Sequence, residues 1–144
     1  YLALAEGHWT NQSKSGLIDR PIEKVPECFN RYQVADTGRP SRTEYEVLSE
    51  FTYEETPFSL VRLKLQTGRT HQIRVHMASL SHPLLGDSIY GHEGFLGFDR
   101  AALHSFEITC QLPGHQDLAV FSSEMPEDFQ KMIAKSINFS STLI

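Results

Sequence analysis

The chain contains 144 residues, of which 40% are hydrophobic and 22% are charged, and its formal net charge is −5. This length predicts one modest domain, and the balanced composition without low-complexity tracts excludes a largely disordered chain. No apolar run approaches the roughly 18 residues needed to cross a bilayer. No signal-peptide pattern is present either, so a cytoplasmic protein is expected.

The first forty residues predict short strands separated by irregular segments. Residues 1–5 form an apolar run that predicts a strand, and this run begins without a methionine, so we expect a truncated piece of a longer protein. Residues 16–22 predict a short extended piece that Pro21 stops, because proline cannot donate to a sheet ladder. Residues 23–40 show little periodicity and predict an irregular excursion.

The next two segments alternate between apolar and polar side chains, which predicts an antiparallel hairpin. Residues 43–51 would form its first strand, with one face made of Thr43, Tyr45, Val47 and Ser49. Residues 59–66 would form its second strand, with an apolar face made of Val61, Leu63 and Leu65.

A helix is predicted to follow this hairpin directly. Gly68 breaks the strand, Thr70 is a suitable N-cap, and the period becomes helical from residue 71 to about residue 80. The buried stripe of this helix is predicted to consist of Ile73, Met77 and Leu80.

The last third of the chain predicts two more strands and one more helix. Residues 86–97 are a glycine-rich loop, residues 101–110 and 118–122 predict strands, and a short amphipathic helix carries Phe129, Met132 and Ile133. Residues 137–144 are expected to be a tail, which leaves residues 1–136 as one domain. The mixture of antiparallel strands and two helices predicts the α+β class.

Arg69, His71 and Arg74 crowd the start of the predicted helix. A helix N-terminus presents unpaired backbone N–H groups and the positive end of a dipole, so this place suits a phosphate or a carboxylate. A capped helix whose arginines pair with ordinary surface acids explains the same residues, and the chemistry alone leaves both interpretations open. The acidic net charge argues mildly against nucleic-acid binding, although a locally basic face is compatible with it.

The central segment resembles the signature of the RluA family of pseudouridine synthases. The resemblance rests on Gly68-Arg69-Thr70-His71-Gln72-Ile73-Arg74-Val75-His76, His82-Pro83-Leu84-Leu85-Gly86-Asp87 and Tyr90-Gly91. Further segments agree in order, namely residues 1–4, 16–22, 40–45, 100–104 and 125–129. The match extends to about residue 133, so it implies the pseudouridine synthase catalytic fold for nearly the whole chain: a mixed, largely antiparallel sheet with flanking helices, incomplete at the N-terminus.

The resemblance implies an enzyme that isomerises uridine in ribosomal or transfer RNA to pseudouridine, as a monomer and without a metal or cofactor. In this family an aspartate attacks the nucleotide, the glycosidic bond breaks, and the base rotates and rejoins through carbon. That aspartate belongs to an Arg-Leu-Asp motif upstream of the tyrosine strand, and no such motif occurs in these 144 residues. The chain alone is therefore expected to be inactive, and Asp87 matches a position with an architectural role.

The resemblance also assigns roles to five residues. Arg74 matches the arginine that pairs with the catalytic carboxylate, and Tyr1 matches the tyrosine that stacks on the target base. Leu103 matches the apolar residue on the other side of that base. Arg69 and His71 are assigned to the RNA backbone or to support of the active site.

Several alternatives stay open on the sequence alone. Tyr1 could be a frayed terminus, Leu103 a core residue, and Arg74 a bridge between two elements. His71 and His76 are five residues apart and point to different sides of a helix, which is poor geometry for a shared metal. Cys28 and Cys110 fit no metal spacing and favour reduced thiols, although one disulfide is compatible with the sequence. A non-catalytic RNA-binding relative is the alternative function, whereas a hydrolase has little support because no Gly-x-Ser-x-Gly motif is present.

Overall fold

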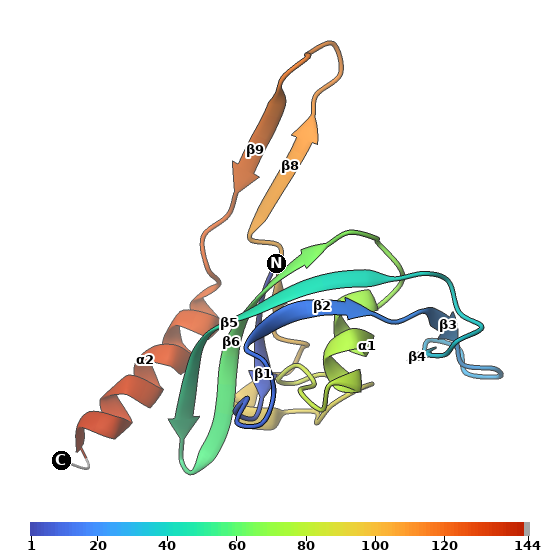
Figure 1. Cartoon of the computed structure of the whole chain (residues 1–144). Helices are drawn as coiled ribbons and strands as arrows, with labels where there is room; N and C mark the ends of the chain where they lie inside the picture. The colour runs from blue at the N-terminus through green and yellow to red at the C-terminus, as the bar shows by residue number, and fades with distance from the viewer. Residues whose placement is uncertain (143–144) are drawn as a thin grey trace.

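The computed structural model describes residues 1–142, with side chains up to residue 137. Its centre is a five-stranded sheet in the order β2-β5-β6-β1-β7, and each of its four adjacent pairs is antiparallel (Figure 1). The sheet strands are β1 (Leu2–Glu6), β2 (Ser15–Asp19), β5 (Arg42–Tyr53), β6 (Thr56–Leu65) and β7 (Leu103–His104). The other elements are β3 (Ile22–Lys24), β4 (Tyr32–Val34), α1 (Gln72–Ser79), the 3-10 turn η1 (Phe95–Gly97), β8 (Glu107–Gln111), β9 (Leu118–Ser122) and α2 (Glu127–Thr142).

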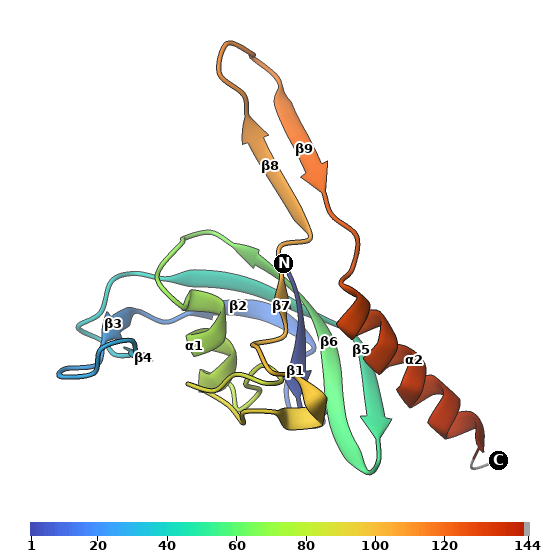
Figure 2. The ribbon, with the colours of Figure 1, turned by 180° about the vertical axis from the view of Figure 1, so that it is seen from behind.

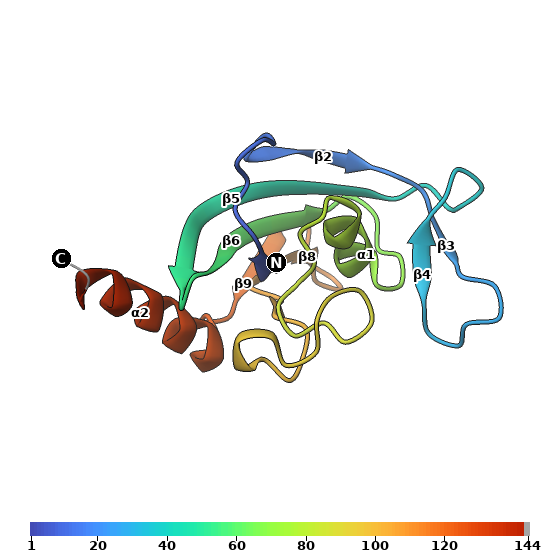
Figure 3. The ribbon, with the colours of Figure 1, turned by 90° about the horizontal axis from the view of Figure 1, so that it is seen from below.

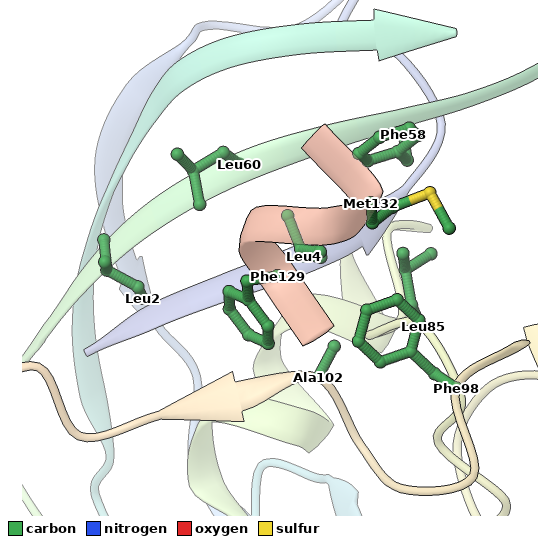
Figure 4. Close-up of a cluster of buried hydrophobic side chains, with 9 residues drawn as sticks. All are labelled: Leu2, Leu4, Phe58, Leu60, Leu85, Phe98, Ala102, Phe129 and Met132. Atoms are coloured by element: carbon green, nitrogen blue, oxygen red, sulfur yellow. The ribbon is translucent and has the colours of Figure 1, made fainter. Parts of the chain in front are cut away.

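Both faces of the sheet are covered, so β1 is apolar and buried from Leu2 to Ala5, before it ends at Glu6. Its side chains alternate between two cores, since successive residues of a strand point to opposite faces. One core lies against α1 and contains Ala3, Ala5, Trp9, Val61, Leu63, Ile73, Met77 and Leu84. The other lies against α2 and contains Leu2, Leu4, Phe58, Leu60, Leu85, Phe98, Ala102, Phe129 and Met132 (Figure 4). The α+β class is confirmed.

A one-residue irregularity in β5 changes which core the strand serves. The pairing with β6 shifts between Val47 and Ser49, which leaves Leu48 without a partner in the register. Before the shift, Tyr45 and Val47 pack on the α1 core, whereas Phe51 beyond it packs on the α2 core. The prediction that Ser49 shares the face of Val47 is therefore wrong, because the extra residue reverses the alternation.

Two small hairpins extend from the central sheet. β3 and β4 pair with each other at one end of the molecule, with α2 at the other end (Figures 1 and 3). β8 and β9 form a ribbon that projects away from the body (Figures 1 and 2). Its exposed apolar side chains include Ile108, Leu118, Val120 and Phe121. The predicted strand 101–110 is thus two strands, because residues 105 and 106 separate β7 from β8.

The helices begin and end differently from the prediction. The N-cap of α1 is His71 rather than Thr70, and its backbone adopts the left-handed conformation with φ 56°. No side chain caps this helix; the Gln72 Oε1 instead fixes the turn before it, since it accepts hydrogen bonds from the Arg69 N–H at 3.0 Å and the Thr67 hydroxyl at 2.9 Å. α2 continues to Thr142, into the segment expected as a tail, and residues 143–144 lie outside the described residues.

Candidate active site

A buried ion pair joins α1 to the loop that follows it. The Nε and Nη2 atoms of Arg74 each donate to one carboxylate oxygen of Asp87, both at 2.7 Å. The Asp87 side chain is fully buried, whereas the Arg74 side chain keeps 19% of its surface exposed. Such a bidentate pair fixes the guanidinium plane as well as its position. Arg74 thus bridges two elements, as one of the open alternatives expected.

Asp87 remains ionised because it has several donors. Burial alone would raise the pKa of Asp87, but hydrogen bonds from Arg74 and from the backbone N–H groups of Ile89 and Tyr90 lower it below its usual value. The same pair raises the pKa of Arg74. The carboxylate therefore acts as a fixed holder of the arginine, which agrees with the architectural role expected for Asp87.

One polar atom of Arg74 is left for another partner. Among the described residues, no atom accepts a hydrogen bond from the Arg74 Nη1. Nη1 is also not one of the buried side-chain atoms that lack a hydrogen-bond partner. Nη1 is therefore accessible to solvent. A guanidinium held on its Nε side can present this remaining edge to a second anion.

The ring of Tyr90 lies against this arginine and links it to other polar and aromatic residues. The Arg74 guanidinium carbon lies 5.2 Å from the centroid of the Tyr90 ring, and Arg31 lies over the same ring at 5.7 Å. The Tyr90 hydroxyl accepts the Tyr32 N–H at 2.9 Å and lies 2.9 Å from His71 Nδ1. Burial lowers the pKa of His71, and the nearby Arg74 adds to this effect, which favours a neutral imidazole beside the Tyr90 hydroxyl.

Buried polar contacts lock α1 against the sheet. His76 is fully buried, and burial lowers its pKa, which favours the neutral ring. Its Nε2 donates to the Arg20 carbonyl at 2.9 Å, so its Nδ1 accepts the Thr43 hydroxyl at 2.8 Å. The Gln72 Nε2 donates to the Arg42 carbonyl and to Thr43, both at 2.9 Å. These bonds fix the helix turn that carries Arg74.

Tyr1 and Leu103 lie on the same face of the sheet as α1. Tyr1 exchanges two backbone hydrogen bonds with Leu63, at 2.8 and 2.9 Å, so its main chain continues the ladder of β1. Its side chain is 37% exposed and lines a groove of about 890 Å³ that also includes Phe106 and Ile108. Leu103 pairs with Ala3 and packs, partly buried, against the α1 core.

The structure brings together only some of the residues that sequence reasoning selected. His71 and Arg74 meet at Tyr90, and Arg69 lies on the preceding turn, where its Nε donates to the Pro40 carbonyl at 3.1 Å. Among the described residues, no hydrogen bond, ion pair or ring contact joins Tyr1 to this group. Sequence reasoning gave no role to Tyr90, although its position three residues after Asp87 in the quoted motif was the available signal.

A family model described as RNA pseudouridylate synthase matches residues 1–79, which is more than half of the chain. The chain belongs to the RNA pseudouridylate synthase family. The family acts on RNA, and the predicted resemblance to pseudouridine synthases is confirmed.

Curated relatives and solved structures of this family show the same similarity. A ribosomal large subunit pseudouridine synthase D of Nitrosomonas europaea is 36% identical over 141 residues, which cover 92% of this chain and 39% of that protein. An uncharacterized RNA pseudouridine synthase of Bacillus subtilis is 39% identical over 132 residues, covering 92% and 42%. The structure of human RNA pseudouridylate synthase domain containing 1 aligns with a TM-score of 0.70 and 30% identity, covering 85% of this chain and 52% of that one. The chain therefore spans about two fifths of the length of these curated relatives.

The described part of the chain contains neither a metal cluster nor a disulfide. No group of three or more His, Cys, Asp or Glu side chains there could hold a metal ion. Cys28 and Cys110 are both free thiols. No helix among residues 1–142 has the length and apolar character to span a membrane.

Proposed function

We propose that this chain forms the arginine side of a pseudouridine synthase active site, within a catalytic domain that includes residues 1–136. The whole protein would convert uridine to pseudouridine in RNA without a cofactor. The nucleophilic aspartate would come from a part of that protein outside these 144 residues, which contain no Arg-Leu-Asp motif.

The observation that supports this proposal is the way Asp87 holds Arg74. The carboxylate occupies Nε and Nη2 and leaves Nη1 in contact with solvent, at a point surrounded by Tyr90 and His71. A second carboxylate that meets this free edge would be kept ionised and oriented by the guanidinium, as a nucleophile requires. Because Asp87 already has four hydrogen-bond donors and no exposed surface, it is poorly suited to be that nucleophile.

Tyr1 would provide a stacking surface for the target base. A uracil that leaves its RNA stack needs a π-face to replace lost stacking, and the partly exposed Tyr1 ring offers one. Leu103 lies on the same face of the sheet and would pack on the base from the other side. His71 would support the arginine through Tyr90, and Arg69 would contact the RNA backbone.

Further properties belong to the same proposal. The RNA would be ribosomal or transfer RNA, and the protein would act as a monomer in the cytoplasm. A relative named for the ribosomal large subunit supports ribosomal RNA as the first substrate to test.

The test measures the release of tritium from RNA labelled at carbon 5 of uridine, because forming the carbon–carbon glycosidic bond displaces that hydrogen. The chain alone should release none, whereas the protein translated from its complete reading frame should release tritium. Arg74→Lys in that protein should abolish release, since lysine cannot keep the bidentate pair and still present a second donor edge. Release by the chain alone would overturn the assignment of the nucleophile. A complete protein that binds RNA but releases no tritium would instead be a non-catalytic RNA-binding relative.

A further inference from the structure

The lysines and arginines without an acidic partner among the described residues cluster at one end of this acidic protein. Six of the 13 lysines and arginines form ion pairs within the described part of the chain, and seven do not. Five of these seven lie on the β3–β4 hairpin, its flanks and the turn before α1, namely Arg20, Lys24, Arg31, Arg39 and Arg69. The same segments also carry the acids Glu23, Glu27 and Asp36, so five cations against three acids leave a local excess of two positive charges on a protein whose net charge is −5.

A pocket lies in the middle of this cationic surface. It has a volume of about 320 Å³ and lies between the β3–β4 hairpin and the turn 68–70. Its cationic lining residues are Lys24, Arg39 and Arg69, and its neutral polar ones include Tyr32 and Thr70. Such a volume falls at the lower end of the range of about 300–1,000 Å³ for small-ligand sites.

The charges of the pocket favour an anion. Glu23 is the one carboxylate that lines it, and both of its oxygens already accept hydrogen bonds, from Thr37 at 2.7 Å and from Gln33 at 3.2 Å. Lys24 and Arg39 are exposed, and neither forms an ion pair among the described residues. The three cations therefore exceed the one acid, and none of the three forms an ion pair among the described residues; Arg69 donates its Nε to the Pro40 carbonyl.

The pocket adjoins the candidate active site through Tyr32. Tyr32 lines the pocket, and its ring meets His71 edge-on with centroids 5.6 Å apart. Its backbone N–H donates to Tyr90, whose ring lies against Arg74. An RNA strand whose target nucleotide lies at Arg74 would thus carry its neighbouring phosphates past Tyr32.

We propose that the pocket lined by Lys24, Arg39 and Arg69 binds backbone phosphate of the RNA strand next to the target nucleotide. This inference rests on the proposed function, because it takes RNA as the partner. The β3–β4 hairpin then acts as a clamp for the strand, separate from the residues that touch the base.

The test compares two variants that lose the same charge. Lys24→Gln/Arg39→Gln removes two cations of the pocket, and Lys131→Gln/Lys135→Gln removes two from α2 at the other end of the molecule. Neither pair belongs to the candidate active site. Binding of a fluorescent single-stranded RNA containing uridine is measured by anisotropy at several salt concentrations. Unchanged circular dichroism and unfolding midpoints verify that both variants fold.

The slope of log K against log salt should fall for the pocket variant only, by about 0.7 for one lost phosphate contact and about 1.4 for two. This corresponds to about 5- to 25-fold weaker binding at 0.1 M salt. Equal effects of the two variants, no effect of either, or no RNA binding by the unmodified chain would overturn the inference.

Tritium release separates this inference from the proposed function. If the complete protein forms pseudouridine but both variants bind RNA equally well, the proposed function is supported and the phosphate pocket is refuted. If only the pocket variant loses RNA affinity but the complete protein forms no pseudouridine, the phosphate pocket is supported and the enzymatic proposal is refuted.

Discussion

Replacing Arg74 by methionine removes the cation that faces the fully buried Asp87 carboxylate, while it keeps an unbranched side chain in α1. Asp87 would then retain only the backbone N–H groups of Ile89 and Tyr90 as donors. Breaking a buried ion pair from one side costs about 3–5 kcal/mol, so the variant should lose much of the stability of a small domain.

Replacing the other partner, by Asp87→Asn, should reduce the free energy of unfolding less than Arg74→Met does. Its side-chain oxygen can keep both backbone hydrogen bonds, and the remaining Arg74 cation reaches solvent through its 19% exposed surface. We expect a loss of about 1.5–3 kcal/mol, as for one hydrogen bond to a charged group. The two single losses should add up to more than the loss in the double variant, with a coupling of about 0.5–3 kcal/mol.

Urea unfolding followed by circular dichroism between pH 7 and pH 3 provides the measurement. The depressed pKa of Asp87 contributes stability that is present above its usual value of 3.8 and is lost as pH falls through the lower folded value. Without Arg74, burial raises the pKa of Asp87 in the folded state instead. Protonation of Asp87 at low pH then removes the buried charge and reduces the destabilisation of the variant. The stability difference between the unmodified chain and Arg74→Met should therefore shrink as pH falls. A constant difference, or a larger cost for Asp87→Asn than for Arg74→Met, would refute this reasoning.

Three further predictions concern the framework around the site. Because burial lowers the pKa of His76, the free energy of unfolding should decrease as pH falls below about 6.5, and His76→Gln should reduce this dependence in urea titrations. Gly86→Ala should lower the free energy of unfolding by more than about 2 kcal/mol, because a Cβ would lie 2.4 Å from a backbone carbonyl oxygen. Gly114→Ala is also at positive φ but in open space, so in the same assay it should lower this free energy by only about 1–2 kcal/mol, through backbone strain. Trp9→Phe should cost about 1–3 kcal/mol in thermal unfolding, since it leaves a buried serine hydroxyl without its indole N–H donor; a cost near zero would show that water replaces the donor.

Long periodic segments were predictable from the sequence because one physical cause determines them. The hairpin of β5 and β6 follows from alternation over many residues, and its predicted apolar residues Val61 and Leu63 are buried. The stripe of α1 follows from helical spacing, and Ile73 and Met77 are buried as expected. In these segments burial and local preference indicate the same structure.

Short or tertiary features were not predictable. β3 and β4 have three residues each, too few for a periodic signal, and their pairing depends on the chain between them. The helix begins at a left-handed His71 without a side-chain cap, and the Gln72 side chain instead holds the preceding turn, an arrangement that no local pattern predicts. In the site, the sequence motif identified Arg74, but the pairing with Asp87 requires the fold to bring together residues 13 positions apart.

The unpaired Leu48 in β5 also marks a point at which the length of this chain can vary. Deleting one residue there would restore a regular ladder with β6 and keep Phe51 opposite Phe58, on which its ring now stacks at 5.2 Å, because paired residues of an antiparallel ladder point to the same face. Adding or removing a residue in the turn after Tyr53 leaves the facing of every strand side chain before it unchanged. Homologous chains that share both cores should therefore differ in length at the turn between β5 and β6 or by the one extra residue at Leu48, and keep the residue counts on either side of Leu48 within β5 constant.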